Sequence, residues 1–80
     1  MEVIEVEGVW QATSAVARGV RLLGCTAPDW RGWVQFQLDD TDGKATAALA
    51  DWETAPITTK ALSEAYREVV YVMRRSKQRY

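Results

Sequence analysis

Few side chains in this sequence could perform catalysis. The chain contains no His and a single cysteine, Cys25. A cysteine nucleophile needs a neighbouring base, and histidine is the usual one, so Cys25 is interpreted as a small buried apolar residue. A zinc site built from several Cys or His residues is excluded by the same composition. The sequence therefore predicts a protein that is not an enzyme and that uses no cofactor and no metal.

A group of acidic residues suggests a calcium loop at first sight. Asp39, Asp40 and Asp42 precede Gly43, and a glycine occupies the sixth position of an EF-hand loop. With Gly43 in that position, Leu38 and Leu49 fall at the first and twelfth ligand positions, and neither can ligate calcium. We interpret the segment as a solvated junction that leads into a helix, with a weak surface cation site as the open alternative.

Two tryptophans flank an arginine in a segment expected to form a turn. Pro28, Asp29 and Gly32 are residues typical of turns, and Trp30, Arg31 and Trp33 lie among them. Exposed Trp and Arg are the residue types most enriched at the energetic centres of protein interfaces. Trp30, Arg31 and Trp33 are thus a candidate interaction surface. The alternative is that they cover the core or the stems of polar side chains, whereas Trp10 and Trp52 are the expected core tryptophans.

Positive charge gathers at the end of the chain. Residues 60–80 carry a net charge of +4, against −5 for residues 1–59. The residues that could contact nucleic acid or a partner are Arg67, Arg74, Arg75, Lys77, Arg79 and Tyr80. Basic side chains at the end of a helix also stabilise its dipole, which explains several of them without any ligand.

The whole composition indicates one small soluble domain. Its 80 residues are 48% hydrophobic and 26% charged, with a net charge of −1, so we expect a single domain over residues 1–80. No apolar stretch approaches the length that spans a bilayer, and the acidic start differs from a signal peptide. With a single cysteine and no disulfide framework, we expect a cytoplasmic location.

Alternation of apolar and polar residues predicts strands near positions 2–7 and 33–38. In the second of these, Val34, Phe36 and Leu38 share one side, which places Trp33 on the wetter side. Glu5 and Glu7 would protect a sheet edge. A further strand is expected to begin at residues 25–26.

Helical periodicity predicts three helices. The first covers residues 13–23, with Thr13 or Ser14 as its N-cap and Gly24 as its stop; the others cover residues 45–52 and 58–77. The resulting order is β-α-β-β-α-α. The predicted fold class is α+β, a small single domain with about three strands and helices packed on one face.

The sequence resembles a family of short domains of unknown function from bacteria, their phages and mobile elements. The shared features are an Ala-rich helix opening at Thr13 and ending at Leu22 to Gly24, a strand ending at Phe36 to Asp40, and a final helix ending in Arg and Lys. They span about residues 13–77. The resemblance implies a phage or prophage-like origin and supports the β-α-β-β-α-α order, and it brings no catalytic residues.

The combined expectation is a protein-interaction module without catalysis, encoded by a phage or mobile element. It would be a virion or assembly component, or a modulator of a host machine such as a defence system. Its partner would be another protein or a second copy of the chain, with no membrane involved. The alternative is a nucleic-acid-binding protein that uses the basic final helix. A third hypothesis is an enzyme, for which Asp and Glu chemistry with a bound metal would be the only route.

Overall fold

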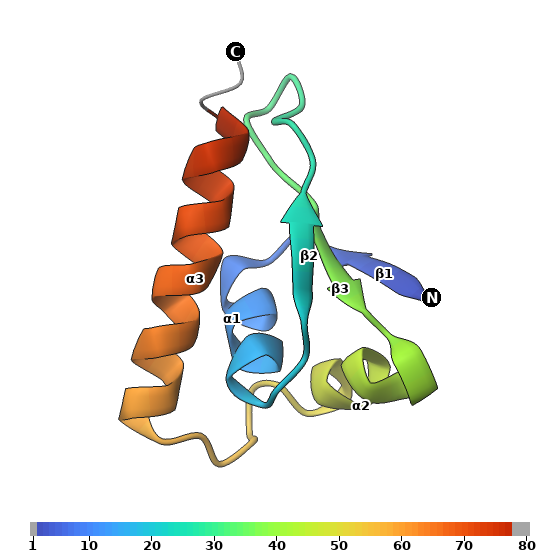
Figure 1. Cartoon of the computed structure of the whole chain (residues 1–80), viewed down its shortest axis with the longest axis vertical. Coiled ribbons are helices and arrows are strands. Elements are labelled where there is room, and N and C mark those ends of the chain that lie inside the picture. The colour runs from blue at the N-terminus through green and yellow to red at the C-terminus, as the bar shows by residue number, and fades with distance from the viewer. Residues whose placement is uncertain (1, 78–80) are drawn as a thin grey trace.

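The computed structural model describes residues 2–77, without the side chains of residues 76 and 77. Its strands are β1 (Val3–Val6), β2 (Leu22–Cys25) and β3 (Phe36–Asp39). Its α-helices are α1 (Val9–Ala17), α2 (Lys44–Ala50) and α3 (Thr59–Lys77), and a short 3-10 helix, η1 (Thr41–Gly43), leads into α2. The predicted fold class and the order β-α-β-β-α-α are confirmed (Figure 1).

The three strands form one antiparallel sheet with β3 in the middle. The strand order is β1-β3-β2, with Val6 and Cys25 both opposite Phe36 on the central strand. Because β1 and β2 both run antiparallel to β3, they are parallel to each other and are joined through α1. The sheet is therefore a split β-α-β unit into which β3 is inserted.

The strand alternation read from the sequence places the core correctly. Phe36 and Leu38 are fully buried, whereas Gln37 between them is only half-buried on the opposite face. Helices α1 and α3 lie together on one side of the sheet (Figure 1). Ala15 of α1 and Val69 of α3 are fully buried in the same core as Phe36. This single apolar face is what the α+β prediction required.

The first helix begins earlier than predicted. Its N-cap is Gly8, so Thr13 and Ser14 are buried in the middle of the helix and the prediction that either caps it is wrong. The Thr13 hydroxyl donates to the Val9 carbonyl at 2.8 Å, and the Ser14 hydroxyl donates to the Trp52 carbonyl at 3.4 Å. These bonds satisfy the buried hydroxyls, which is why small polar residues are tolerated there.

The first helix also ends earlier, and its last predicted residues form β2. Gly19 has φ +94°, the Gly19 N–H donates to the Val16 carbonyl, and the Val20 N–H donates to the Ala15 carbonyl, both at 3.0 Å. This pair of bonds around a left-handed glycine is the Schellman helix end. The prediction of helix up to residue 23 is therefore wrong, because the helix stops before Gly19 and releases Leu22 into the sheet.

Trp10 is not a core residue. It is 54% exposed, and its ring stacks on that of Tyr66 with centroids 4.9 Å apart and planes 10° apart. The core side of α1 is filled by Ala12 and Ala15, which let the helix approach the sheet closely and leave the larger indole outside. The prediction that Trp10 belongs to the core is therefore wrong. Trp52 is half-buried and is not among the residues of the core cluster.

The acidic junction is held by hydrogen bonds within the chain. The Asp40 carboxylate is buried and accepts from the Thr46 N–H at 2.8 Å and from the Thr46 hydroxyl at 2.7 Å. These bonds, the hydroxyl bond first, lower the pKa of Asp40. Asp39 accepts in the same way from Thr41, so the two carboxylates fix the passage from β3 into α2.

Candidate protein-interaction site

The hairpin between β2 and β3 continues beyond the two strands. The Thr26 N–H donates to the Gln35 carbonyl at 2.9 Å, and the Gln35 N–H donates to the Thr26 hydroxyl at 3.0 Å. Further out, the Asp29 N–H donates to the Trp33 carbonyl at 2.9 Å. The segment that carries Trp30, Arg31 and Trp33 is therefore the tip of a hydrogen-bonded hairpin.

The tip is a three-residue hairpin loop. The Gly32 N–H donates to the Asp29 carbonyl at 2.9 Å, which closes a β-turn over Trp30 and Arg31. Gly32 has φ +81°, a left-handed conformation that glycine adopts without strain. A turn followed by a left-handed residue is a common way to join two antiparallel strands by three residues. The turn predicted from Pro28, Asp29 and Gly32 is confirmed.

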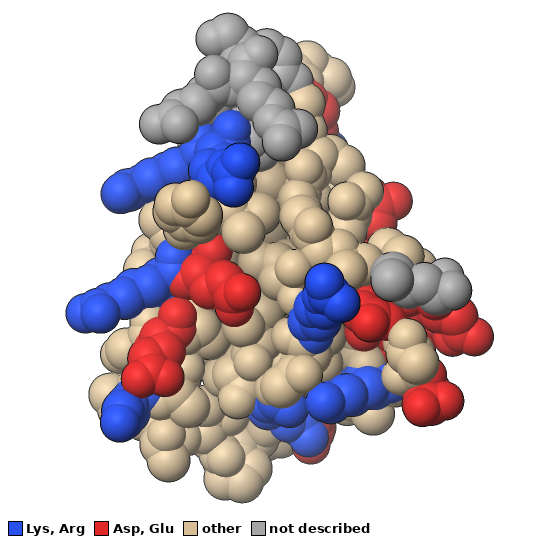
Figure 2. Space-filling view, in the orientation of Figure 1, with Lys and Arg blue, Asp and Glu red and all other residues tan. Residues whose placement is uncertain are grey.

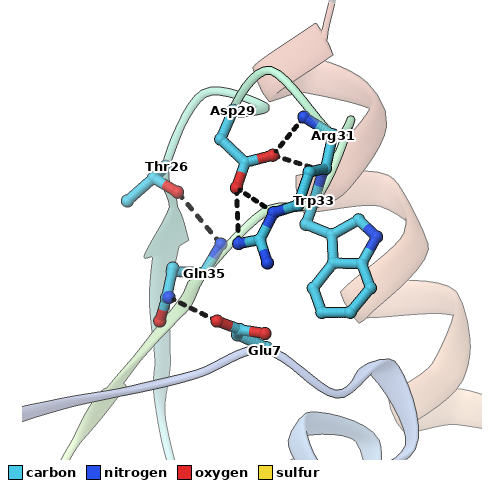
Figure 3. A network of polar contacts seen from close by, with 6 residues as sticks. All are labelled: Glu7, Thr26, Asp29, Arg31, Trp33 and Gln35. Carbon is cyan, nitrogen blue, oxygen red and sulfur yellow. Dashed lines mark hydrogen bonds and ion pairs between the residues drawn. The ribbon is translucent and has the colours of Figure 1, made fainter.

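The Asp29 carboxylate stabilises the tip by hydrogen bonds to Arg31 and Trp33 (Figure 3). One oxygen, Oδ1, accepts from the backbone N–H groups of Arg31 at 2.8 Å and of Trp33 at 3.1 Å. The other, Oδ2, accepts from Nε of Arg31 at 3.1 Å and from Nη2 at 2.8 Å. The hydrogen bond from the Arg31 side chain is the main cause that lowers the pKa of Asp29, and the same bond raises the pKa of Arg31.

The two tryptophans at the tip remain in contact with solvent. Trp30 is 92% exposed and Trp33 is 55% exposed. The Arg31 guanidinium carbon lies 4.6 Å from the centroid of the Trp33 ring and 5.7 Å from that of Trp30, so the cation contacts both rings. The Arg31 cation thus lies nearer to Trp33 than to Trp30, and Trp30 remains almost fully exposed.

A shallow pocket of about 360 Å³ lies at the base of the tip. Trp33, Val9 of α1 and Met73 of α3 line it together with Glu7. The Glu7 carboxylate accepts from the Gln35 side-chain amide at 3.1 Å (Figure 3). The indole of Trp33 lies on the α3 side of the hairpin (Figure 3). The tip is thereby continuous with the surface of α3.

The basic residues of the final helix form a second candidate surface. Arg67, Arg74 and Arg75 are exposed on α3, and Arg75 lies 5.8 Å from the Tyr71 ring centroid. Figure 2 shows basic side chains along the outer side of α3 with acidic side chains beside them. The side chain of Lys77 and both Arg79 and Tyr80 lie outside the described residues.

Two properties of the described part of the chain bear on other functions. Among residues 2–77, no three His, Cys, Asp or Glu side chains gather closely enough to hold a metal ion. No helix within these residues is long and apolar enough to cross a membrane.

The Cys25 thiol is half-buried and lies 3.7 Å from the Val72 carbonyl of α3.

Comparisons with known proteins return no relative. No family model, curated protein or solved structure matches the chain. The resemblance to short bacterial and phage domains stays a prediction.

Sequence reasoning identified the tip residues but missed two arrangements that involve α3. The pairing of Asp29 with Arg31 had a signal, because an acid and an arginine two residues apart in a turn can meet. The stacking of Trp10 on Tyr66, and the position of Trp33 beside Met73, depend on how α3 packs. No local pattern in the sequence reports that packing.

Proposed function

We propose that this domain is a protein-interaction module without catalytic activity, and that Trp30, Arg31 and Trp33 form its contact surface. The observation that carries the proposal is the exposure of Trp30, 92%, on a tip closed by hydrogen bonds. An indole kept in water forfeits the stabilisation that burial would give it. A partner that covers Trp30 recovers that stabilisation.

The bonding of the tip supports this proposal. The tip is closed by a backbone hydrogen bond between Asp29 and Trp33. The Asp29 carboxylate also accepts from the main chain and the side chain of Arg31, so Arg31 is already ordered before a partner binds. A contact surface that is already ordered loses less conformational entropy on binding. Trp and Arg are also the residue types that most often contribute the largest share of binding energy.

The proposal names the class of the partner and not its identity. It is a protein, either another chain or a second copy of this one. The sequence resemblance adds to the proposal an origin in a phage or mobile element, in a bacterial host cell or a virion, and a role in the virion or in modulating a host machine. The intracellular location is also part of the proposal, and it rests on the single cysteine.

Site-specific photo-crosslinking in cells that make the protein tests the proposal. A photoreactive benzoylphenylalanine replaces Trp30 in one variant and Ala47 in a matched control, since Ala47 is exposed on α2 away from the tip. Position 30 is expected to yield one discrete crosslinked protein that position 47 does not. Equal crosslinking at both positions, or none at position 30, contradicts the proposal.

Nucleic-acid binding is the second candidate function. Arg67 and Arg74 line a hollow of about 370 Å³ on α3 together with Tyr66, Tyr71 and Val70, which places cations beside aromatic rings. Such a combination suits a phosphate backbone with stacked bases. Against it, Glu64 and Glu68 lie on the same helix, and their charges repel phosphate.

Fluorescence anisotropy with labelled single- and double-stranded oligonucleotides at low salt tests this second candidate. Binding that weakens steeply as salt rises, and that is lost in Arg67→Ala/Arg74→Ala, would support it. An absence of binding at low salt would dismiss it.

A further inference from the structure

The side of α3 next to the hairpin tip carries a continuous aromatic and apolar stripe. Tyr66, Val70 and Met73 lie at spacings of four and three residues, so they share one face of the helix. Trp33 lines the same pocket as Met73 at one end of this face, and Trp10 stacks on Tyr66 at the other. We call Trp33, Met73, Val70, Tyr66 and Trp10 the aromatic stripe; none of the five is buried.

One border of the aromatic stripe carries two arginines, whereas Glu64 and Glu68 of the same helix line a different pocket. Arg67 and Arg74 are seven residues apart, one on each side of Val70 along the helix, and both line the hollow that Tyr66 and Val70 also line. Neither arginine has an ion-pair partner among the contacts of the described residues. Both cations are therefore available to a ligand that lies on the stripe.

We propose that the partner docks an acidic amphipathic segment along the aromatic stripe, with its apolar side chains on Trp33, Val70 and Trp10 and its carboxylates facing Arg67 and Arg74. This inference rests on the proposed protein-interaction function and names the chemistry of the partner. Two cations spaced by two helical turns beside an apolar stripe complement a segment whose acidic residues follow one edge of an apolar face.

A polypeptide fits the stripe better than a nucleic acid does. Trp10 and Tyr66 stack on each other, so each ring already has one face covered and cannot sandwich a base. Glu7 at the Trp33 end and Glu53 near Trp10 place negative charge on the opposite border, which repels a phosphate chain. A peptide accommodates both borders by carrying acidic residues on one edge only.

Selection from a random 16-residue peptide library displayed on yeast tests the inference, with the full chain as bait. The enriched peptides are expected to contain apolar residues at helical spacing and an excess of Asp and Glu. The strongest of them, made synthetically, is then titrated against three proteins: the unchanged chain, Arg67→Glu/Arg74→Glu, and the control Arg21→Glu/Lys60→Glu. The control makes the same change in net charge at two exposed positions that line neither the pocket beside Trp33 nor the hollow on α3.

Reversal at Arg67 and Arg74 should weaken peptide binding about tenfold or more, and the control should change it less than about twofold. Circular dichroism and thermal unfolding confirm that both variants stay folded. Enriched peptides without acidic excess, or equal weakening in both variants, would overturn the inference. Two other outcomes would also overturn the inference. One is a dimer, seen by light scattering, that dissociates in Arg67→Glu/Arg74→Glu. The other is an oligonucleotide that binds the unchanged chain and not this variant.

The inference and the proposed function can fail separately. If crosslinking from position 30 succeeds while the selected peptides ignore the charge reversal, the interaction module stands and the acidic partner is wrong. If position 30 fails to crosslink, the interaction function itself is contradicted.

Discussion

The Asp29 carboxylate binds Arg31 through both the main chain and the side chain. Oδ1 accepts from the Arg31 N–H at 2.8 Å, and Oδ2 accepts from Nη2 at 2.8 Å. The same carboxylate reaches the Trp33 N–H at 3.1 Å. One acidic side chain thus fixes the turn and the cation that lies between the two exposed indoles.

Replacing Asp29 is expected to loosen the tip without unfolding the domain. Asp29→Ala removes the acceptor for two backbone N–H groups and the partner of the Arg31 guanidinium. Hydrogen exchange followed by NMR should show faster exchange at Arg31 and Trp33, while the midpoint of thermal unfolding stays nearly unchanged because the site is exposed. Asp29→Asn keeps one acceptor oxygen and loses the charge. Its exchange rates should lie between those of the unchanged protein and those of Asp29→Ala. Unchanged exchange in Asp29→Ala would contradict the role of this carboxylate.

Gly32 is expected to be required for the shape of the tip. An added Cβ meets no atom within 4 Å at this position, so the penalty for Gly32→Ala arises only from its φ of +81°, and amounts to about 1–2 kcal/mol. The tip should rearrange to relieve this strain, which NMR shifts of Trp33 and Trp30 would report. Gly32→Asn should be milder, since Asn tolerates the left-handed region better. Identical shifts in Gly32→Ala and the unchanged protein would contradict this account.

Acid is expected to weaken the tip and the junction before α2. The pKa values of Asp29 and Asp40 are both lowered from 3.8 by hydrogen bonds that the charged carboxylates accept. Their stabilising effect is therefore complete above the unfolded pKa near 3.8 and is lost as the pH falls through the lower, folded pKa. Urea unfolding between pH 7 and pH 2.5 should show declining stability below about pH 4, with a smaller decline in Asp40→Asn. An Asp40 carboxyl that titrates at or above 3.8 by NMR would contradict this prediction.

A core substitution and a tip substitution should differ in their effect on the free energy of unfolding. Phe36→Ala leaves a cavity at the centre of the sheet and should lower the free energy of unfolding by about 3–5 kcal/mol. That loss is a large fraction of the total stability of a domain of this size. Trp30→Ala removes a side chain that is almost fully exposed and should change the free energy of unfolding by less than about 0.5 kcal/mol. Urea titration measures both. A large loss of stability in Trp30→Ala would mean that the indole serves the fold and not a partner.

Local sequence patterns predicted the sheet centre and the final helix well. The alternation around Phe36 and Leu38 marks a strand with one apolar face, and the periodicity of residues 58–77 matches α3 closely. The turn at Asp29 to Gly32 followed from residue types that favour it. In each case, neighbours along the chain determine the structure.

The boundary between α1 and β2 could not be read in this way. Leu22 and Leu23 suit either a helix or a strand, and the choice depends on pairing with β3 and on the helix end at Gly19. Trp10 was misplaced for a related reason, since the closeness of α1 to the sheet decides which of its faces has room for an indole. Both errors arise where contacts distant in sequence override local preference.

The affinity of the crosslinked partner for tip variants tests the central claim most directly. Isothermal titration with the purified partner would compare Trp30→Ala and Trp33→Ala with Val3→Ala, which removes an exposed apolar side chain from β1, outside both the tip and the aromatic stripe. If the tip is the contact surface, at least one tryptophan variant should lose about 30-fold in affinity while Val3→Ala loses less than about threefold. Equal affinities for the unchanged protein and both tryptophan variants would contradict the claim.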